Sequence, residues 1–198
     1  MLLGKWLLFL LLLGGLFAMM RLWRGRPVRL TTATDAGHQA MRDAGSAFQA
    51  WLAVLYRDRP EAVAPLFAAI AEQAAQQDED ALTPEAVVHF ESAERLDADH
   101  VFAVEWKDGE SFIDYAGDMA ARFGFALQWT DTERETALPD VLMQAAAPQF
   151  AARGVILYNA DTGADFYWLM AVPAADRADF EAASSAWGLP VREAEQPY

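Results

Sequence analysis

The chain has 198 residues, of which 54% are hydrophobic and 22% charged, so it can bury the core of one ordinary domain. Its net charge is −14, but the first thirty residues hold five cations and no acid, so the other 168 residues carry −19. So acidic a body would repel nucleic-acid phosphates, which argues against a nucleic-acid partner. The absence of cysteine excludes disulfides, thiolate metal ligands and a cysteine nucleophile.

The first predicted element is an apolar run over residues 2–20, interrupted only by Lys5. As a helix rising about 1.5 Å per residue, this run would just span a hydrocarbon layer of roughly 30 Å. Trp6 and Trp23 stand near its two ends, where indole rings prefer the membrane interface. A cleaved signal peptide and a buried soluble helix are the alternatives. A cleaved signal would need a shorter apolar stretch and a small-x-small cleavage site, whereas this run continues to Arg21.

We therefore expect residues 1–24 to form a single transmembrane anchor. Four arginines follow the apolar run, whereas only the α-amino group and Lys5 lie at its start. Because positively charged flanks stay in the cytoplasm, the N-terminus is expected outside and the C-terminal domain inside. The chain uses thirteen arginines but only two lysines, which together with abundant alanine suggests a GC-rich bacterial genome. The expected location is thus a bacterial inner membrane.

A linker over residues 25–35 follows, with a helix start expected at Thr34 or Asp35. Apolar residues at helical spacing then predict a helical hairpin over residues 36–78, whose second helix starts near Pro60. Residues 85–195 are expected to form an α/β sandwich domain. Its predicted strands are 101–106, 125–129, 154–158, 165–172 and 189–193, and its predicted helices are 110–123, 138–151 and 174–187.

This order of elements predicts an α+β fold in which a mixed β-sheet carries helices mainly on one face. It resembles a ferredoxin-like sandwich with an inserted helix. The polar stretch around Asp131, Glu133 and Glu135 is expected to be a loop, and Asn159 to Gly163 a tight turn between two strands.

Three short motifs carry a resemblance to a known family. They are Val104-Glu105-Trp106-Lys107-Asp108, Asp161-Thr162-Gly163-Ala164-Asp165-Phe166-Tyr167 and Trp187-Gly188-Leu189. With them the chain resembles a family of uncharacterised bacterial proteins known only as a domain of unknown function, over about residues 85–195. The resemblance implies one compact bacterial domain and no particular substrate.

The end of the first predicted strand is the candidate ligand-binding site, with Glu105, Trp106, Lys107 and Asp108 in front of a helix start. Strand ends that face a helix N-terminus often hold ligands in α/β proteins, and Lys107 could contact an anion or carry a proton. The alternative is structural: Glu105 and Lys107 face solvent, and Asp108 caps the helix.

A metal site and a cofactor site are not expected. Two imidazoles and three carboxylates fall close together in the sequence, but no histidine pair has the spacing that places both on one helical face, so a solvated loop is favoured. These residues are His89, Glu91, Asp97, Asp99 and His100. The series from Asn159 to Asp165 departs from a calcium loop, because its glycine is one place early and Met170 stands where a bidentate glutamate is required. No nucleotide-binding or hydrolase motif is present in the sequence.

Two functions follow from these features as hypotheses. The first is a non-enzymatic interaction module, tethered to the membrane through residues 2–20, whose acidic surface selects a basic protein partner. The second is a small-ligand binder or enzyme that uses the strand edge from Glu105 to Asp108.

Overall fold

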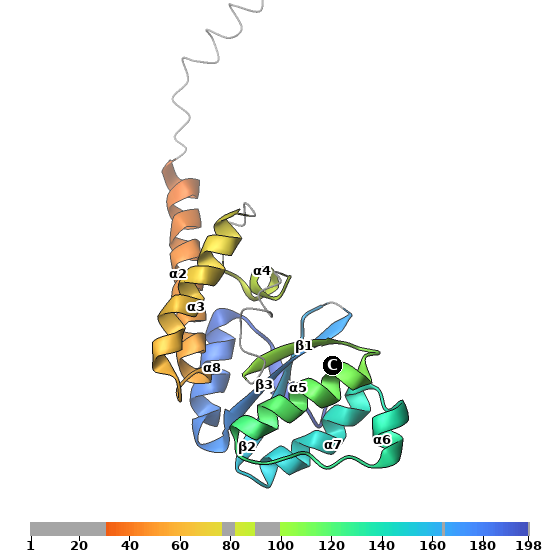
Figure 1. Cartoon of the computed structure of the whole chain (residues 1–198). Coiled ribbons are helices and arrows are strands. Elements are labelled where there is room, and N and C mark those ends of the chain that lie inside the picture. The colour runs from red at the N-terminus through yellow and green to blue at the C-terminus, as the bar shows by residue number, and fades with distance from the viewer. Residues whose placement is uncertain (1–30, 77–81, 90–99, 164, 198) are drawn as a thin grey trace, which may run out of the picture. The chain divides into compact units, whose positions relative to one another are not determined.

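The computed structural model describes residues 31–76, 82–89, 100–163 and 165–197 (Figure 1). The predicted anchor and linker residues 25–30 lie outside these ranges. By its contacts the chain divides into two units, Met1–His38 and Gln39–Tyr198. Within the described ranges, no helix combines the length and apolar character needed to cross a bilayer.

Two long helices open the described part. Helix α2 covers Thr31–Leu55, so residues 31–35, which we expected in the linker, are helical. Helix α3 covers Pro60–Gln76 and begins at the predicted proline, where the missing N–H has no intrahelical partner to lose. A short helix that the sequence did not predict, α4, covers Pro84–His89.

The sheet has four strands in the order β1-β3-β2-β4. The expected mixed sheet is wrong, because every strand pair is antiparallel. Strand β3 lies between β1 and β2, with Ala103 of β1 opposite Trp168 and Tyr158 of β2 opposite Met170. The strands are β1 (Val101–Glu105), β2 (Val155–Ala160), β3 (Phe166–Pro173) and β4 (Val191–Glu193).

Helices cover both faces of this sheet, so the expectation of helices mainly on one face is also wrong (Figure 1). Helices α5 (Gly109–Arg122) and α7 (Pro139–Ala151) pack on one face, while α2, α3 and α8 (Arg177–Trp187) pack on the other. Every residue of β2 is buried, because alternate side chains enter opposite cores. Apart from α6 (Asp131–Thr136) and α7, which are inserted after α5, and the short 3-10 turn before α8, the succession β1-α5-β2-β3-α8-β4 is that of a ferredoxin-like chain. Here, however, α5 and α8 lie on opposite faces of the sheet. The α+β class is confirmed.

The predicted strand over residues 125–129 is not formed. The side chain of Gln149 on α7 accepts a hydrogen bond from the Gln128 backbone N–H at 2.8 Å and donates one to the Gln128 backbone carbonyl at 3.0 Å. These bonds satisfy the backbone groups that a strand would present to a neighbour. The expected loop after it contains helix α6 (Asp131–Thr136), which begins with a capping box between Thr130 and Glu133.

A cluster of buried aromatic rings joins the first helix to the sheet. Trp51 of α2 stacks on Trp168 of β3 at a centroid distance of 5.7 Å and lies 4.9 Å from Trp187 of α8. Its indole Nε1 donates to the Ser184 hydroxyl at 3.2 Å. The last helix is preceded by a short 3-10 turn, η2 (Ala174–Asp176), and ends at Gly188, whose φ of +84° requires the conformational freedom of glycine.

Candidate functional site

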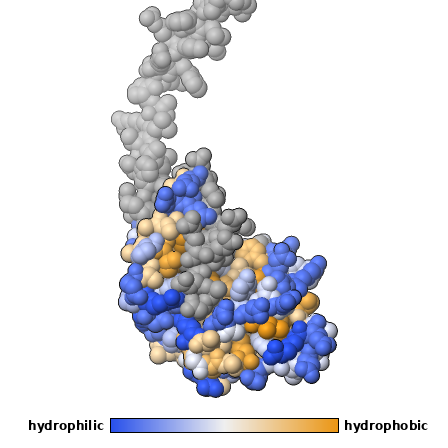
Figure 2. Space-filling model, viewed as in Figure 1, coloured by the Kyte–Doolittle hydropathy of each residue, from blue (hydrophilic) through white to orange (hydrophobic). Residues whose placement is uncertain are grey.

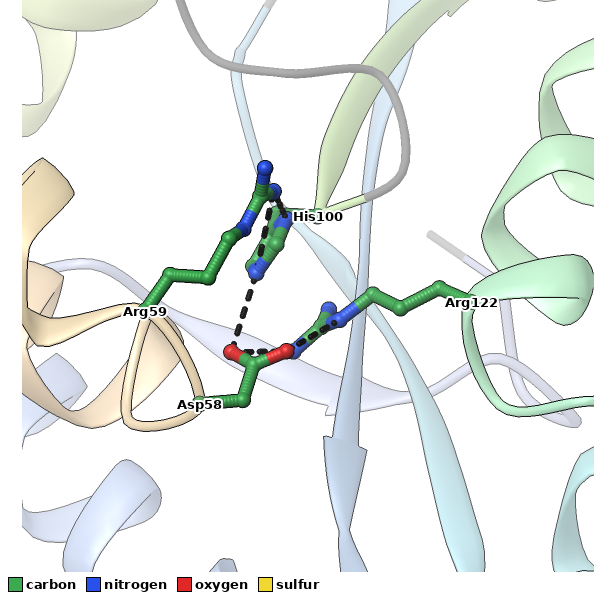
Figure 3. Close-up of polar contacts among 4 residues, drawn as sticks. All are labelled: Asp58, Arg59, His100 and Arg122. Carbon is green, nitrogen blue, oxygen red and sulfur yellow. Dashed lines mark hydrogen bonds and ion pairs between the residues drawn. The ribbon is translucent and has the colours of Figure 1, made fainter.

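A polar network brings together residues from three separate parts of the fold (Figure 3). Asp58 and Arg59 lie in the turn between α2 and α3, His100 directly precedes β1, and Arg122 is the last residue of α5. Turn residues and helix ends have backbone groups and side chains that secondary structure does not use, so the three segments can meet through polar contacts.

His100 is the centre of this network, and its side chain is fully buried. The imidazole stacks on the ring of Tyr56 at a centroid distance of 4.1 Å, with the two planes 4° apart. Arg59 Nη2 lies 2.6 Å from His100 Nδ1, and His100 Nε2 lies 3.1 Å from Asp58 Oδ1. Because a guanidinium can only donate, Nδ1 accepts from Arg59, and the ring proton belongs on Nε2, which donates to Asp58.

Asp58 connects the histidine to Arg122. Arg122 donates to it twice, from Nε to Oδ2 at 3.0 Å and from Nη2 to Oδ1 at 3.1 Å. The side chain of Arg122 is only 9% exposed, whereas that of Asp58 is 48% exposed. Partial burial alone would raise the pKa of Asp58, but the bonds from Arg122 and His100 outweigh it and lower the pKa below its ordinary value.

A hollow of about 410 Å³ adjoins the network, and Asp58 and Arg122 form part of its wall. Arg57, which also lines it, is paired with Asp176 and donates to Asp179 at 2.8 Å. The two arginines of the hollow are therefore both met by aspartates, so the hollow does not offer the concentrated positive charge that an anionic substrate would need.

This geometry fits a structural joint better than a catalytic centre. A general base must reach the proton that it removes, but His100 is buried and both of its ring nitrogens are already in contact with protein groups. Among the described residues, no group of three or more histidines or carboxylates could hold a metal ion. His100 is not in the solvated loop that the sequence suggested, and the other members of that candidate metal set lie outside the described side chains.

The predicted ligand site at the end of β1 is only partly assembled. Trp106 is 44% exposed, and Lys107 Nζ lies 4.2 Å from the centroid of its ring. Asp108 caps α5, since its Oδ1 accepts the Ser111 N–H at 3.0 Å. Hydrogen bonds from the Ser111 side chain and from this N–H lower the pKa of Asp108. A hollow of about 320 Å³ lies between Trp106 and the β2–β3 turn, but Glu105, Lys107 and Asp108 do not line it.

Sequence reasoning did not identify the network. Asp58, Arg59 and Arg122 were not singled out, and His100 was considered only as a metal ligand. The available signal was the pair of charged residues directly before Pro60, in a turn between two apolar helices. That signal does not name their partners, since 42 and 64 residues separate Asp58 from His100 and from Arg122.

These features define a small α+β domain whose antiparallel sheet lies between two layers of helices. Its polar network links the turn between α2 and α3 to the start of β1 and the end of α5. The chain belongs to the family described as Domain of unknown function (DUF6630), whose sequence model matches residues 47–194. The match begins within α2, so the family domain includes the C-terminal part of α2, all of α3 and the sheet. No curated protein and no solved structure matches the chain.

Proposed function

We propose that this protein is a non-enzymatic interaction module, tethered to a bacterial inner membrane by one N-terminal helix, whose acidic domain binds a basic protein partner in the cytoplasm. The observation that carries the proposal is the separation of charge along the chain. Residues 1–30 hold five cations and no acid, while the remainder carries a net charge of −19.

The apolar run over residues 2–20 supports the tether, because its length matches a hydrocarbon layer and interfacial tryptophans flank it. The arginines that follow it support a cytoplasmic domain. A tether also confines the domain to a thin layer beside the membrane, which raises the effective concentration that any membrane-proximal partner meets.

Exposed acidic side chains on the surface of the domain support the proposal that it binds a basic protein. On α5 the exposed face carries Glu110, Asp114 and Asp118, and α6 adds exposed Asp131 and Glu135. Figure 2 shows hydrophilic surface with smaller apolar areas between and beside these helices. A field of one sign steers an oppositely charged partner and speeds its association.

The tether is tested by fractionating cells that express the full chain or a chain without residues 1–24. We expect the full chain to stay in membranes washed with alkaline carbonate and the shortened chain to be released. A full chain that is released, or that has lost its first residues, would contradict the tether. Orientation is tested with two C-terminal fusions, one to a reporter active only outside the inner membrane and one to a reporter active only inside. Activity of the outside reporter alone would contradict the cytoplasmic assignment.

The partner is tested by purifying the full chain in a mild non-ionic detergent at low salt. We expect a basic protein to co-purify and to be released between about 0.1 and 0.5 M salt, because the Debye length falls below 10 Å in this range. Recovery of no basic protein, or recovery that salt leaves unchanged, would refute the interaction role.

A small-ligand site at the end of β1 is the second candidate, and the 320 Å³ hollow beside Trp106 favours it. Its exposed indole could stack on an apolar or cationic ligand. Changes in Trp fluorescence of the full chain during ligand screening, lost in Trp106→Ala but kept in Trp129→Phe, would identify such a ligand. Lys107→Ala separates the ligand role from a structural one, because it removes the cation without altering the cap at Asp108.

A further inference from the structure

Within the described part of the chain, the outer edge of the last strand, β4, pairs with no further strand. Among the described residues β4 pairs only with β2, through bonds that include Asp161 N–H to the Pro190 carbonyl at 3.0 Å and Ala194 N–H to the Leu157 carbonyl at 2.8 Å. In an antiparallel ladder, alternate residues point their backbone groups to opposite sides. Because Pro190 and Ala194 point toward β2, Val191 and Glu193 point their N–H groups away from it.

A cleft of about 750 Å³ lies along this edge. Its wall includes Val191 and Glu193 of β4, Glu195 after it, and Tyr158 and Glu181 behind it. Glu193 and Glu195 also line a second hollow of about 290 Å³, next to the first residues of β2, where β4 no longer accompanies that strand. The two hollows therefore follow one continuous length of sheet edge.

The cleft is acidic, and neighbouring side chains position two of its three glutamates. Three glutamates line it against one arginine, Arg192. Tyr158 donates its hydroxyl to Glu181 Oε1 at 2.9 Å, and burial together with this bond raises the pKa of Tyr158, so the phenol keeps the proton that positions Glu181. Arg177 pairs with Glu193 and sets its direction.

We infer that the β4 edge binds an extended, basic segment of a partner protein by adding it to the sheet as a fifth strand. This inference rests on the proposed function and names the surface that performs it. The Val191 N–H and C=O and the Glu193 N–H supply main-chain bonds, while the Glu193 carbonyl already accepts from Gln196 at 3.0 Å. Glu181 and Glu195 select arginine or lysine on the added strand, while Glu193 is paired with Arg177.

Charge decides between a basic segment and a second copy of this chain. An edge-to-edge dimer would bring two sets of the same three glutamates together, within domains that each carry −19. Like charges directly opposite across strands are destabilising. A basic segment turns the same carboxylates into attractive contacts, so it is the occupant that fits.

The strand geometry is tested with the full chain in detergent and a labelled eight-residue peptide of alternating arginine and valine. Two matched peptides are N-methylated, one at its arginines and one at its valines. Successive amides of a strand point to opposite edges, so only one of these two sets of N–H groups can face β4. We expect one methylated peptide to bind about threefold to tenfold more weakly than the other, as the loss of the one backbone hydrogen bond to the Val191 carbonyl implies.

The surface is tested with a Glu181→Gln and Glu195→Gln variant. We expect it to weaken binding of the unmethylated peptide by about fivefold to tenfold at physiological salt. The matched control, Glu110→Gln with Asp114→Asn, removes two charges from α5 and should change binding by less than about twofold, because charges beyond a Debye length are screened.

Three outcomes distinguish this inference from the function on which it rests. Different affinities for the two methylated peptides, with sensitivity to Glu181 and Glu195, support the edge. Equal affinities, or equal effects of the two charge variants, overturn the edge even if a basic protein co-purifies with the chain. Failure of every peptide to bind, while a basic protein is retained, overturns the edge alone; the interaction role falls only if that protein is also missing.

Discussion

Replacing Asp58 by alanine tests whether the His100 network joins the first helices to the sheet. The substitution removes three hydrogen bonds, two from Arg122 at 3.0 and 3.1 Å and one from His100 at 3.1 Å. Bonds to a charged group contribute about 1.5–3 kcal/mol when buried, whereas fully exposed ion pairs contribute about 0.2–1 kcal/mol each. Since Asp58 is 48% exposed but both of its partners are nearly or fully buried, we expect a loss of about 2–3 kcal/mol.

Asp179→Ala is the matched control for this loss. Asp179 also accepts a hydrogen bond from an arginine, Arg57, at 2.8 Å, but its side chain is 63% exposed and Arg57 is 46% exposed. Solvent screens such a pair, so this variant should lose less than about 1 kcal/mol. The two variants thus compare arginine–aspartate pairs that differ in their solvent exposure.

The assay is urea unfolding of the full chain in a mild non-ionic detergent, followed by tryptophan fluorescence. Trp51 and Trp168 are buried against each other, so their emission reports separation of α2 from the sheet. A double-mutant cycle with Arg122→Met should give a coupling of about 1–2 kcal/mol between Asp58 and Arg122. If Asp58→Ala costs no more than Asp179→Ala, or if the coupling is near zero, the network does not hold these elements together.

Further variants test the packing and the ionisation of Asp58 by the same unfolding assay. Gly109→Ala should destabilise the chain, because a Cβ at this position would lie 2.2 Å from the Ala137 carbonyl oxygen. Gly117→Ala should stabilise the chain by about 0.5–1 kcal/mol, because a Cβ there would meet nothing within 4 Å. Equal effects of the two substitutions would contradict this reasoning. Asn159→Val should raise the free energy of unfolding by about 1–2 kcal/mol, since no described residue hydrogen-bonds the buried amide of Asn159. A lower free energy of unfolding would indicate that the amide has a partner. Because the pKa of Asp58 is lowered in the folded state, the ionised side chain contributes its full stability above the ordinary pKa of 3.8. This contribution is lost as the pH falls through the pKa of the folded state, so the free energies of unfolding of wild type and Asp58→Asn should converge on acidification.

Local signals in the sequence predicted the parts of the fold that depend on a few neighbouring residues. Pro60 begins α3, Asp108 caps α5 and Gly188 ends α8, because each of these residue types suits the backbone geometry or the hydrogen bonding of its position. The turn after β2 is of the same kind, since Asp161 Oδ1 accepts the Gly163 N–H at 3.0 Å.

Features that depend on distant residues were not predictable in this way. The segment 125–129 has the composition of a strand, but the side chain of Gln149, 21 residues away, bonds the backbone that a neighbouring strand would have used. In β2 all six residues are buried, and a nearly continuous apolar run of this kind indicates a strand covered on both sides, but it does not identify the helices that cover each side. The network at His100 joins residues that are far apart in the sequence, and a single charged residue does not identify its partner.

The polar groups of this domain are therefore used in two different ways. Asp58, Arg122 and His100 satisfy one another in and around a buried site, so their substitution should change stability. Glu181 and Glu195 line the cleft beside β4, whose outer edge pairs with no other strand among the described residues, so their substitution should change binding while stability stays nearly constant. A variant at Glu181 and Glu195 that unfolds as easily as Asp58→Ala would show that the β4 edge belongs to the framework of the domain, and a basic partner would then have to bind elsewhere on its acidic surface.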